Sequence, residues 1–548
     1  MPDVTKNNFT SNKHPIITTT NFFSIYIWCT AIIVIISVLL HLRIGLNNDT
    51  MTLMHQTYKM LAGGKPYVDF VDVNPPLIHY LFTIPLIFSQ ATGIKLYVAL
   101  NLFATIIAAL SLCVVAGVLR GGGTKKATRT LTISSLALAL LSISFMHQLF
   151  ADREWLLTTL ITPLLVLYSP LVTRETVSKR WYVATVLMAC IGFCLKPYAL
   201  TLYAAALLYR PISGQPLHNI FHEKISYIII IAGMIYALAV WIFAREYIIS
   251  ILPAALQTYG TISWDWGSKY NIIMQQLLGS YALAGLVSTF ILVIVAPSFY
   301  HRTITYLLLL MVGALGSYAL SPGWYYTQYP FMAVAFLLAV TAGGSLLKAC
   351  RIIPNSLHKN LAMSIVCIGI ASALWSAYLA PIKTQLEWDL TLMRDTGRPM
   401  YATNMHSASL EKVETHLNIH PRFLFLSFGV WSPNLLNASG KRESIGRFDY
   451  LWPLPGILQQ KEKPSYNVLA KWFAETLADD ITNKKPGVII CDVSSDMYFL
   501  PPHYKILEFF TSNEKFAAAW NDYTLADTID ECTQDVQQNC AYQVYYRK

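Results

Sequence analysis

Long apolar segments dominate the chain between residues 21 and 380. Of the 548 residues, 55% are hydrophobic and only 13% are charged, a balance that soluble domains do not show. The sequence therefore predicts a polytopic α-helical membrane protein of about eleven transmembrane helices, since each span needs about 17–25 apolar residues. The candidate spans are residues 21–44, 94–119, 130–149, 155–171, 181–195, 198–209, 225–243, 277–295, 304–320, 331–347 and 361–380.

The sequence divides into three parts by composition. Residues 1–20 are a polar tail, residues 21–380 form the membrane domain, and residues 381–548 have the mixed charges of a soluble domain. Within this last part, the apolar runs 422–427 and 487–492 predict buried strands, and the pattern of 468–479 predicts a helix. A small C-terminal α/β domain follows from these signals.

Basic residues favour one orientation in the membrane. The loops 120–129, 174–180, 210–224, 301–302 and 348–359 are basic and fall on one face, which the positive-inside rule makes cytoplasmic. The N-terminus is then cytoplasmic and the C-terminal domain extracytoplasmic. The net charge of +10 is explained by this bias, so we infer no nucleic-acid binding.

The apolar segment 76–92 leaves two topologies open. If it crossed the membrane, the basic tail and the loop that contains Asp49 would both change sides. If it lies on or dips into the membrane, the tail stays inside. Its double-proline start favours the second arrangement, an interfacial helix.

Nine cysteines are scattered along the chain, and none has the spacing of a zinc site. Cys532 and Cys540 lie close together in the predicted outer domain. They are candidates for a disulfide in an oxidising compartment.

Polar and charged residues, which are costly near a membrane and therefore usually have a function, gather on the predicted outer loops. Asp49 follows the first span, and the same loop carries a turn-rich run from residue 63 to 77. Asp152, Arg153 and Glu154 are consecutive between two later spans, and Lys196 ends another span. The members of this set are Asp49, Tyr67, Asp69, Asn74, Asp152, Arg153, Glu154, Lys196, Tyr325 and Tyr326.

Each of these residues has a purely structural alternative. Asp49 would cap the helix that follows it, at residues 51–62. The residues 152–154 would form an interfacial salt-bridge cluster, and Lys196 would extend its amine to the headgroups. Tyr325 and Tyr326 would belong to an aromatic belt. Their convergence on one face favours instead a polar, partly embedded cavity that opens outward.

In this order, the loop motifs resemble the GT-C glycosyltransferases, most closely the bacterial aminoarabinose and galacturonosyl transferases and the protein O-mannosyltransferases. The resemblance covers about the first 350 residues. It is carried by Asp49, the run Gly64-Lys65-Pro66-Tyr67-x-Asp69 followed by Asn74-Pro75-Pro76-Leu77, Asp152-Arg153-Glu154-Trp155, Lys196-Pro197, and Trp324-Tyr325-Tyr326…Pro330.

The resemblance implies a transferase that takes a sugar from a polyprenyl-phosphate carrier. The acceptor is a hydroxyl of a lipid, glycan or protein outside the cytoplasm, and the setting is the cell envelope at a bacterial inner membrane. Asp49 matches the proposed catalytic base, Asp152 and Glu154 match a second acidic motif, and Lys196 matches a basic residue near the carrier phosphate. Asn74 stands near a position where the aminoarabinose transferases tend to have a Glu-Lys pair, so no metal site is carried over.

The chemistry of the residues agrees with that implication. A phosphate-linked sugar already has a leaving group, so no cofactor is required, and assistance by a divalent metal ion is left open. Inverting transfer needs a base at the acceptor hydroxyl, which Asp49 supplies, and positive charge at the phosphate, which Arg153 and Lys196 supply. The further substrate-binding residues are then Tyr67, Asp69, Asn74, Tyr325 and Tyr326.

Two other classes of function compete with a transferase. A transporter or flippase for a lipid-linked glycan is the main alternative, although we find no internal repeat and the ionisable residues lie at one face. A sensor with a ligand-binding outer domain would leave the carboxylates of the outer loops without a role.

Overall fold

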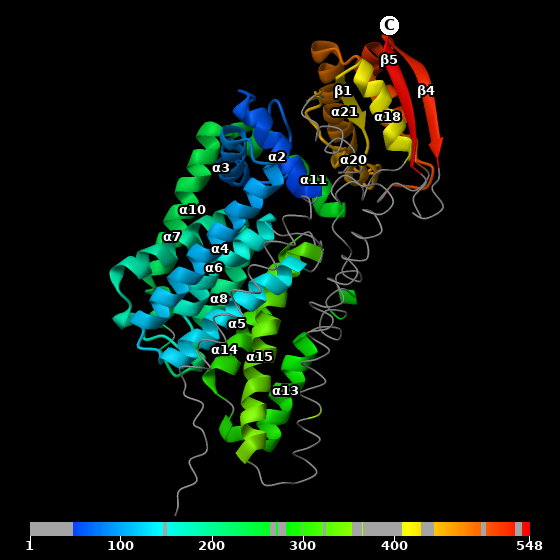
Figure 1. Ribbon diagram of the computed structural model, residues 1–548. Helices are drawn as coiled ribbons and strands as arrows, with labels where there is room; N and C mark the ends of the chain where they lie inside the picture. Colours follow the sequence, from blue (N-terminus) through cyan, green and yellow to red (C-terminus); the bar gives the residue numbers. More distant parts are fainter. Residues whose placement is uncertain are drawn as a thin grey trace, which may run out of the picture.

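An α-helical bundle and a C-terminal α/β unit make up the described part of the chain (Figure 1). A computed structural model describes residues 48–145, 151–216, 218–262, 281–299, 301–321, 325–352, 408–428, 443–494, 500–531 and 540–548, and in addition the single positions 270, 271, 274 and 364.

The helices of the bundle follow the apolar segments of the sequence. Each predicted span between residues 94 and 347 coincides with a helix, and the predicted spans 21–44 and 361–380 lie outside the described residues. The helices are α4 (Leu96–Gly121), α5 (Lys126–Phe145), α6 (Arg153–Leu167), α7 (Lys179–Leu195), α8 (Leu200–Ile212), α10 (Lys224–Phe243), α13 (Tyr281–Val295), α14 (Arg302–Leu320) and α15 (Tyr329–Ile352).

Four of these helices are long and apolar enough to cross a membrane by length and composition: α4, α10, α14 and residues 329–349 of α15. The total of about eleven spans stays a prediction. Helix α10 leaves most of its apolar side chains exposed, for example Ile235 and Phe243, as expected of a helix that faces lipid.

Small residues allow α8 and α14 to lie close together. A Cβ atom at Gly313 would lie only 2.7 Å from the Cβ of Ala205 and 2.8 Å from the carbonyl oxygen of Thr201. The hydroxyl of Thr201 donates a 2.7 Å hydrogen bond to the carbonyl of Gly313. Close approach through small residues, with a hydroxyl bonded across the interface, is the usual packing of membrane helices.

Two helices precede the bundle, α2 (Asn48–Leu61) and α3 (Leu77–Thr92), and both were predicted as helices. Helix α3 starts after the double proline and ends at Gly93, whose positive φ of 71° is the left-handed cap that glycine favours. Leu53 of α2 and Phe82 of α3 share the hydrophobic core of the bundle. The depth of α3 in the membrane remains a prediction.

Residues 245–262, which follow α10, are helical. A π-helical turn (Tyr247–Ile251) leads into α11 (Leu252–Ile262). The apolar residues Tyr247, Ile251 and Ala254 are buried, and they share a core with the C-terminal unit. This burial stabilises the helical segment.

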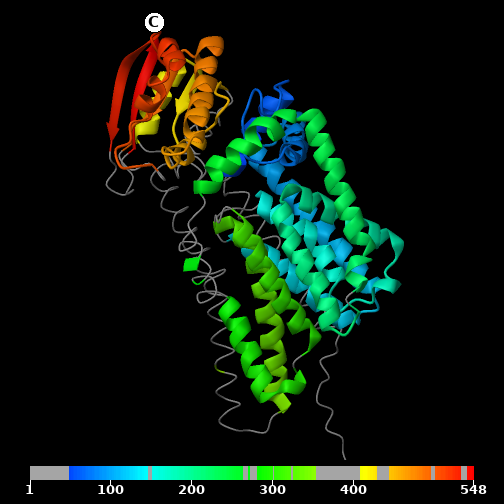
Figure 2. The same cartoon turned by 180° about the vertical axis from the view of Figure 1, so that it is seen from behind.

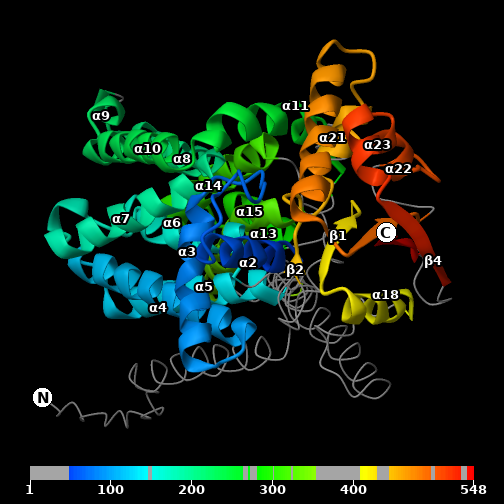
Figure 3. The ribbon, with the colours of Figure 1, turned by 90° about the horizontal axis from the view of Figure 1, so that it is seen from above.

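The C-terminal unit has three layers, with a sheet between two layers of helices (Figure 3). The strand order is β2-β1-β3-β5-β4, with β1 parallel to β2 and β3, and with β5 antiparallel to β3 and β4. Helix α18 (Ala408–Ile419) packs on one face, and α21, α22 and α23 pack on the other. The bounds are β1 (Arg422–Leu426), β2 (Glu443–Ser444), β3 (Val488–Asp492), β4 (Tyr523–Glu531), β5 (Cys540–Arg547), α20 (Pro453–Leu458), α21 (Ser465–Lys484), α22 (Ile506–Thr511) and α23 (Glu514–Trp520).

The strands predicted at 422–427 and 487–492 are confirmed as β1 and β3, and the helix predicted at 468–479 is confirmed as part of α21. The predicted disulfide cannot be placed, since Cys532 and the side chain of Cys540 lie outside the described residues. The domain limits at residues 20 and 380 also lie there and stay predictions.

The C-terminal unit shares a hydrophobic cluster with the loop between α2 and α3 and with the segment before α11. The first loop, which connects α2 and α3, contributes Tyr67 and Val71 to a buried hydrophobic cluster. The same cluster contains Ile251 of the segment before α11, and Phe448 and Leu454 of the C-terminal unit. Figure 2 shows α11 extending from the bundle toward the C-terminal unit. The elements around the first loop are thereby held between the two units.

Candidate functional site

Charged side chains from the starts of two helices meet at the end of the bundle where α2 lies. Asp49 is in the first turn of α2, Asp152 precedes α6, and Arg153 and Glu154 begin it. Nη2 of Arg153 lies 3.6 Å from Oδ2 of Asp49, and its Nε lies 3.6 Å from Oδ1 of Asp152 and 3.9 Å from Oε2 of Glu154. One guanidinium therefore faces three carboxylates.

The junction between α7 and α8 adds a second cation to this group. Nζ of Lys196 lies 3.4 Å from Oε1 of Glu154, and the hydroxyl of Tyr198 donates to the same oxygen over 3.1 Å. Lys196 lies just after the end of α7, where Pro197 stops the helix from continuing. Glu154 is fully buried, so these two contacts compensate much of the cost of keeping its charge.

The first loop joins the same network through Asn74. Nζ of Lys196 donates to Oδ1 of Asn74 over 3.2 Å, and Nδ2 of Asn74 donates to both carboxylate oxygens of Asp72, over 2.9 and 3.0 Å. Nε2 of His79 in α3 lies 3.2 Å from the Asp72 carboxylate. The Asp72 carboxylate thus fixes which way the Asn74 amide points. A continuous chain of polar contacts then links α3, the first loop, α6 and α2.

Strained backbone occurs in both loops that carry the cluster. Ala151, directly before Asp152, has φ +71°, and Tyr67 has φ +65°. Left-handed conformations of residues other than glycine cost about 1–3 kcal/mol each and are typical of functional loops. Ala151 is fully buried, and its turn allows the Asp152 carboxylate to accept from the Arg153 amide over 2.7 Å.

Burial separates the carboxylates of the cluster into two kinds. The side chains of Asp72, Asp152 and Glu154 are at most 4% exposed, whereas that of Asp49 is 29% exposed. Burial, together with the neighbouring Glu154 charge, raises the pKa of Asp152 well above its usual range. Asp49 is therefore the carboxylate of this cluster that a substrate can reach.

Most of the residues predicted for the site come together. Asp49, Asn74, Asp152, Arg153, Glu154 and Lys196 form the connected cluster, and the hydroxyl of Tyr67 donates to the carbonyl of Asn74 over 2.5 Å. Asp69 does not join it; this residue is exposed and its carboxylate accepts from the Lys65 amide within its own turn. Tyr325 and Tyr326 lie in a 3-10 turn, and their side chains are outside the described residues.

Three members of the network were not predicted as site residues: Asp72, His79 and Tyr198. Asp72 lies inside the run 63–77 that the sequence analysis singled out, and Tyr198 directly follows the motif Lys196-Pro197. His79 lies on the apolar helix α3 and is fully buried there. A histidine within an apolar segment expected at the membrane was the sequence signal that could have identified His79 as a site residue.

No metal-binding group is found among the residues that the structure describes: no cluster of three or more His, Cys, Asp or Glu residues there has suitable geometry.

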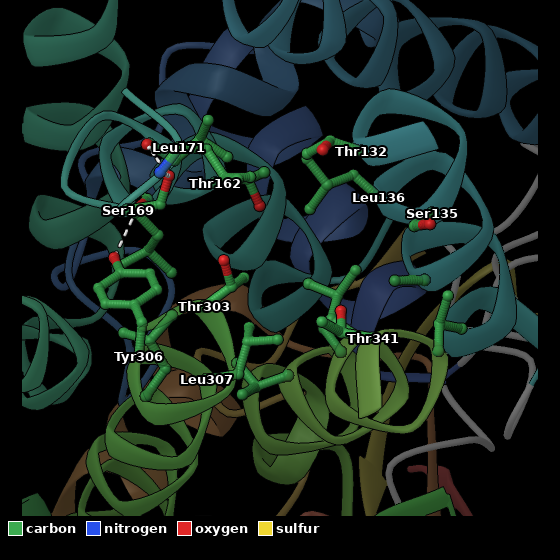
Figure 4. A pocket seen from close by; sticks show the side chains of 18 of the residues that line it. Thr132, Ser135, Leu136, Thr162, Ser169, Leu171, Thr303, Tyr306, Leu307 and Thr341 are labelled. Atoms are coloured by element: carbon green, nitrogen blue, oxygen red, sulfur yellow. Dashed lines mark hydrogen bonds between the residues drawn. The ribbon is translucent and has the colours of Figure 1, made fainter. Parts of the chain in front are cut away.

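A separate cavity of 380 Å³ lies between α5, α6, α14 and α15 and is lined mainly by aliphatic side chains (Figure 4). On α15 its lining extends from Pro330 to Lys348, which corresponds to about 27 Å of helix. At one end lies Thr158, whose hydroxyl donates over 2.7 Å to the carbonyl of Glu154. The cavity thus comes within about one helical turn of the charged cluster.

No protein-family model matches the sequence, and no curated protein matches it. Solved structures similar to the chain include ArnT from Cupriavidus metallidurans bound to undecaprenyl phosphate, at 11% identity and a TM-score of 0.49, covering 96% of this chain and 98% of that one. Another is the oligosaccharyltransferase AglB from Archaeoglobus fulgidus with an inhibitory peptide and a dolichol-phosphate, at 12% identity and a TM-score of 0.46, covering 94% and 75%. The arabinofuranosyltransferase AftD from Mycobacteria is similar at 11% identity and a TM-score of 0.43, covering 95% and 41%.

Proposed function

We propose that the protein is a membrane glycosyltransferase of the GT-C kind. It moves a sugar from a polyprenyl-phosphate carrier to a hydroxyl of a lipid, glycan or protein on the extracytoplasmic face. The observation that carries this proposal is the contact of the accessible Asp49 with Arg153, within a network that also contains Lys196. A carboxylate beside two cations is the minimum that transfer from a sugar phosphate needs.

In the proposed reaction, Asp49 accepts the proton of the acceptor hydroxyl. The freed oxygen forms a bond to the anomeric carbon, while the bond from that carbon to the phosphate oxygen breaks. The polyprenyl phosphate leaves with the electron pair, and the configuration at the sugar inverts. Arg153 and Lys196 stabilise the negative charge that develops on the leaving phosphate.

The ion pairs within the charged cluster affect how the donor phosphate binds. Arg153 and Lys196 are already in contact with Asp49, Asp152 and Glu154. The phosphate of the donor must therefore share these cations with the carboxylates. A protonated Asp152, consistent with its raised pKa, reduces the repulsion and leaves more of the Arg153 charge for the phosphate.

The aliphatic cavity supports a donor with a hydrocarbon chain. Its lining is mainly apolar, and at one end it is lined by Thr158, whose hydroxyl donates a hydrogen bond to the carbonyl of Glu154. A prenyl chain in this cavity would leave its phosphate beside Arg153 and Lys196. The reaction needs no cofactor, and addition or chelation of divalent ions during the assay tests whether a metal ion assists.

Transfer assays with the purified protein in detergent and defined polyprenyl-phosphate sugars test the proposal. We expect release of the polyprenyl phosphate and a new glycoside, both followed by mass spectrometry. Replacement of Asp49 by asparagine is expected to reduce transfer at least about 100-fold, as loss of a general base does. Asp69→Asn is the matched control, because Asp69 lies in the same loop but only closes its own turn.

Two results would contradict the proposal. Turnover of Asp49→Asn at the rate of the unchanged protein would remove Asp49 as the base. Movement of a lipid-linked glycan across vesicles with no new glycosidic bond would show a transporter instead.

A further inference from the structure

Asp449 of the C-terminal unit is buried against α2. Its side chain is 1% exposed, and Oδ1 lies 3.0 Å from Nδ1 of His55 and 3.2 Å from Nζ of Lys59. The same Lys59 ammonium donates to the carbonyl of Gly446 over 2.8 Å. These partners are separated by almost 400 positions in the sequence, so the contact is purely tertiary.

Helix α2 is consequently held from two sides. His55 and Lys59 are four residues apart and so lie on one side of the helix, toward the C-terminal unit. Leu53 and Met54 belong to the core of the bundle. Figure 3 shows α2 between the bundle and the C-terminal unit. Asp49 stands at the beginning of this same helix.

The segment that carries Asp449 is itself firmly anchored. We call residues 446–449 the docking segment. Nε of Arg447 lies 2.9 Å from Oδ1 of Asp480 in α21, and the carbonyl of Arg447 accepts from the amide of Val71 over 2.8 Å. The docking segment therefore connects α21, the first loop and α2, and it transmits the position of the C-terminal unit to α2.

We propose that Asp449 is a positioning residue for the proposed base: through Lys59 and His55 it sets the orientation of α2 and hence the place of the Asp49 carboxylate. This inference rests on the proposed function. Asp49 and Lys59 are separated by about 15 Å along a stiff helix, so a small rotation at one end displaces the other. A displacement of about 1 Å at a reacting group costs about 100-fold in rate.

The kinetic test uses the full chain with Asp449→Asn. We expect kcat to fall about 10- to 100-fold while KM for the donor stays within about twofold, because the phosphate-binding cations do not move. Asp449→Glu, which keeps the charge, should recover part of kcat. The control is Glu508→Gln in the same unit, since Glu508 pairs with Lys505 over 2.8 Å at the surface of α22.

Hydrogen exchange separates positioning from loss of fold. In Asp449→Asn, the amides of residues 48–61 should exchange faster, while those of β3 and α21 keep their protection. An unchanged kcat would overturn the inference, as would loss of protection in β3 and α21 together with α2. If Asp49→Asn proves fully active, the role of Asp49 in the proposed function is refuted independently of this inference. Hydrogen exchange of the α2 amides in Asp449→Asn then still shows whether Asp449 holds this helix.

Discussion

Nη2 of Arg153 lies 3.6 Å from Oδ2 of Asp49, and this contact joins the first turn of α6 to the first turn of α2. The two residues are about a hundred positions apart in the sequence, and each begins a helix. Helix N-termini carry partial positive charge, which stabilises carboxylates placed there. The geometry thus stabilises Asp49 in its ionised form, the form that a base requires.

Arg153→Lys should keep the protein folded but lower transfer. The planar guanidinium faces three carboxylates at once, whereas an ammonium serves one direction at a time. We expect kcat/KM to fall about 10- to 100-fold, measured by release of polyprenyl phosphate. Arg174→Lys is the control, because Arg174 pairs with Glu223 outside the cluster. Equal activity of Arg153→Lys and the unchanged protein would exclude a need for the guanidinium.

Lys196→Met should destabilise the protein, since it leaves the buried Glu154 carboxylate without its ammonium partner. Removal of one member of a buried pair costs about 3–5 kcal/mol. Glu154→Gln in the same chain should recover part of that loss. Thermal unfolding of the two single variants and the double variant in detergent gives the coupling energy, and strictly additive changes would show that the two residues do not interact.

Asn74→Leu should affect substrate binding more than folding. The Asn74 amide connects Asp72 to Lys196, so its loss frees the Lys196 ammonium to change position. We expect KM for the donor to rise about 10- to 150-fold, corresponding to a hydrogen bond to a charged group. Asn74→Asp places a second carboxylate beside Asp72 and should be worse than Asn74→Leu. The reverse order would contradict the role assigned to this amide.

The contact between Asp449 and α2 should weaken in acid. Burial alone would raise the pKa of Asp449, but Lys59 and His55 outweigh burial and hold it below its ordinary value. A carboxyl whose pKa is depressed in the folded state stabilises the fold above the unfolded value, about 3.9, and loses that contribution as the pH falls toward the folded value.

Acid titration of unfolding can check this linkage. As the pH falls below about 5, the free energy of unfolding of the unchanged protein should decrease more steeply than that of Asp449→Asn. Parallel curves for the two proteins would mean that Asp449 contributes no pH-dependent stability. The Glu508→Gln variant, whose side chain is 71% exposed in the unchanged protein, should behave like the unchanged protein.

The sequence was sufficient to predict the helices and to select the loops of the site. Apolar segments of the bundle and the strands at 422–427 and 487–492 have local periodicity, and local periodicity is what a single sequence reveals. Asp49, Arg153 and Lys196 were expected on one face, because topology alone brings alternate loops together. Asp69 was chosen with its neighbours from a motif, yet it serves only its own turn.

Contacts between distant segments could not be predicted in this way. The spacing of His55 and Lys59 shows that they share one side of a helix, but it does not indicate what lies opposite. Asp449 comes from a part of the chain without any recognisable motif. Likewise, α11 was not among the predicted helices, because the partner that buries Ile251 and Ala254 lies in the C-terminal unit.

The hydrophobic core shared by the first loop, α11 and the C-terminal unit has a consequence for protein engineering. A chimaera that exchanges only residues 381–548 with a related enzyme would set foreign apolar surfaces against Tyr67, Val71 and Ile251. Grafts that keep the first loop and α11 with their own carboxyl-terminal partner should assemble more readily. Exchange of the C-terminal unit between related proteins would then require three separate stretches of the polypeptide to be transferred together.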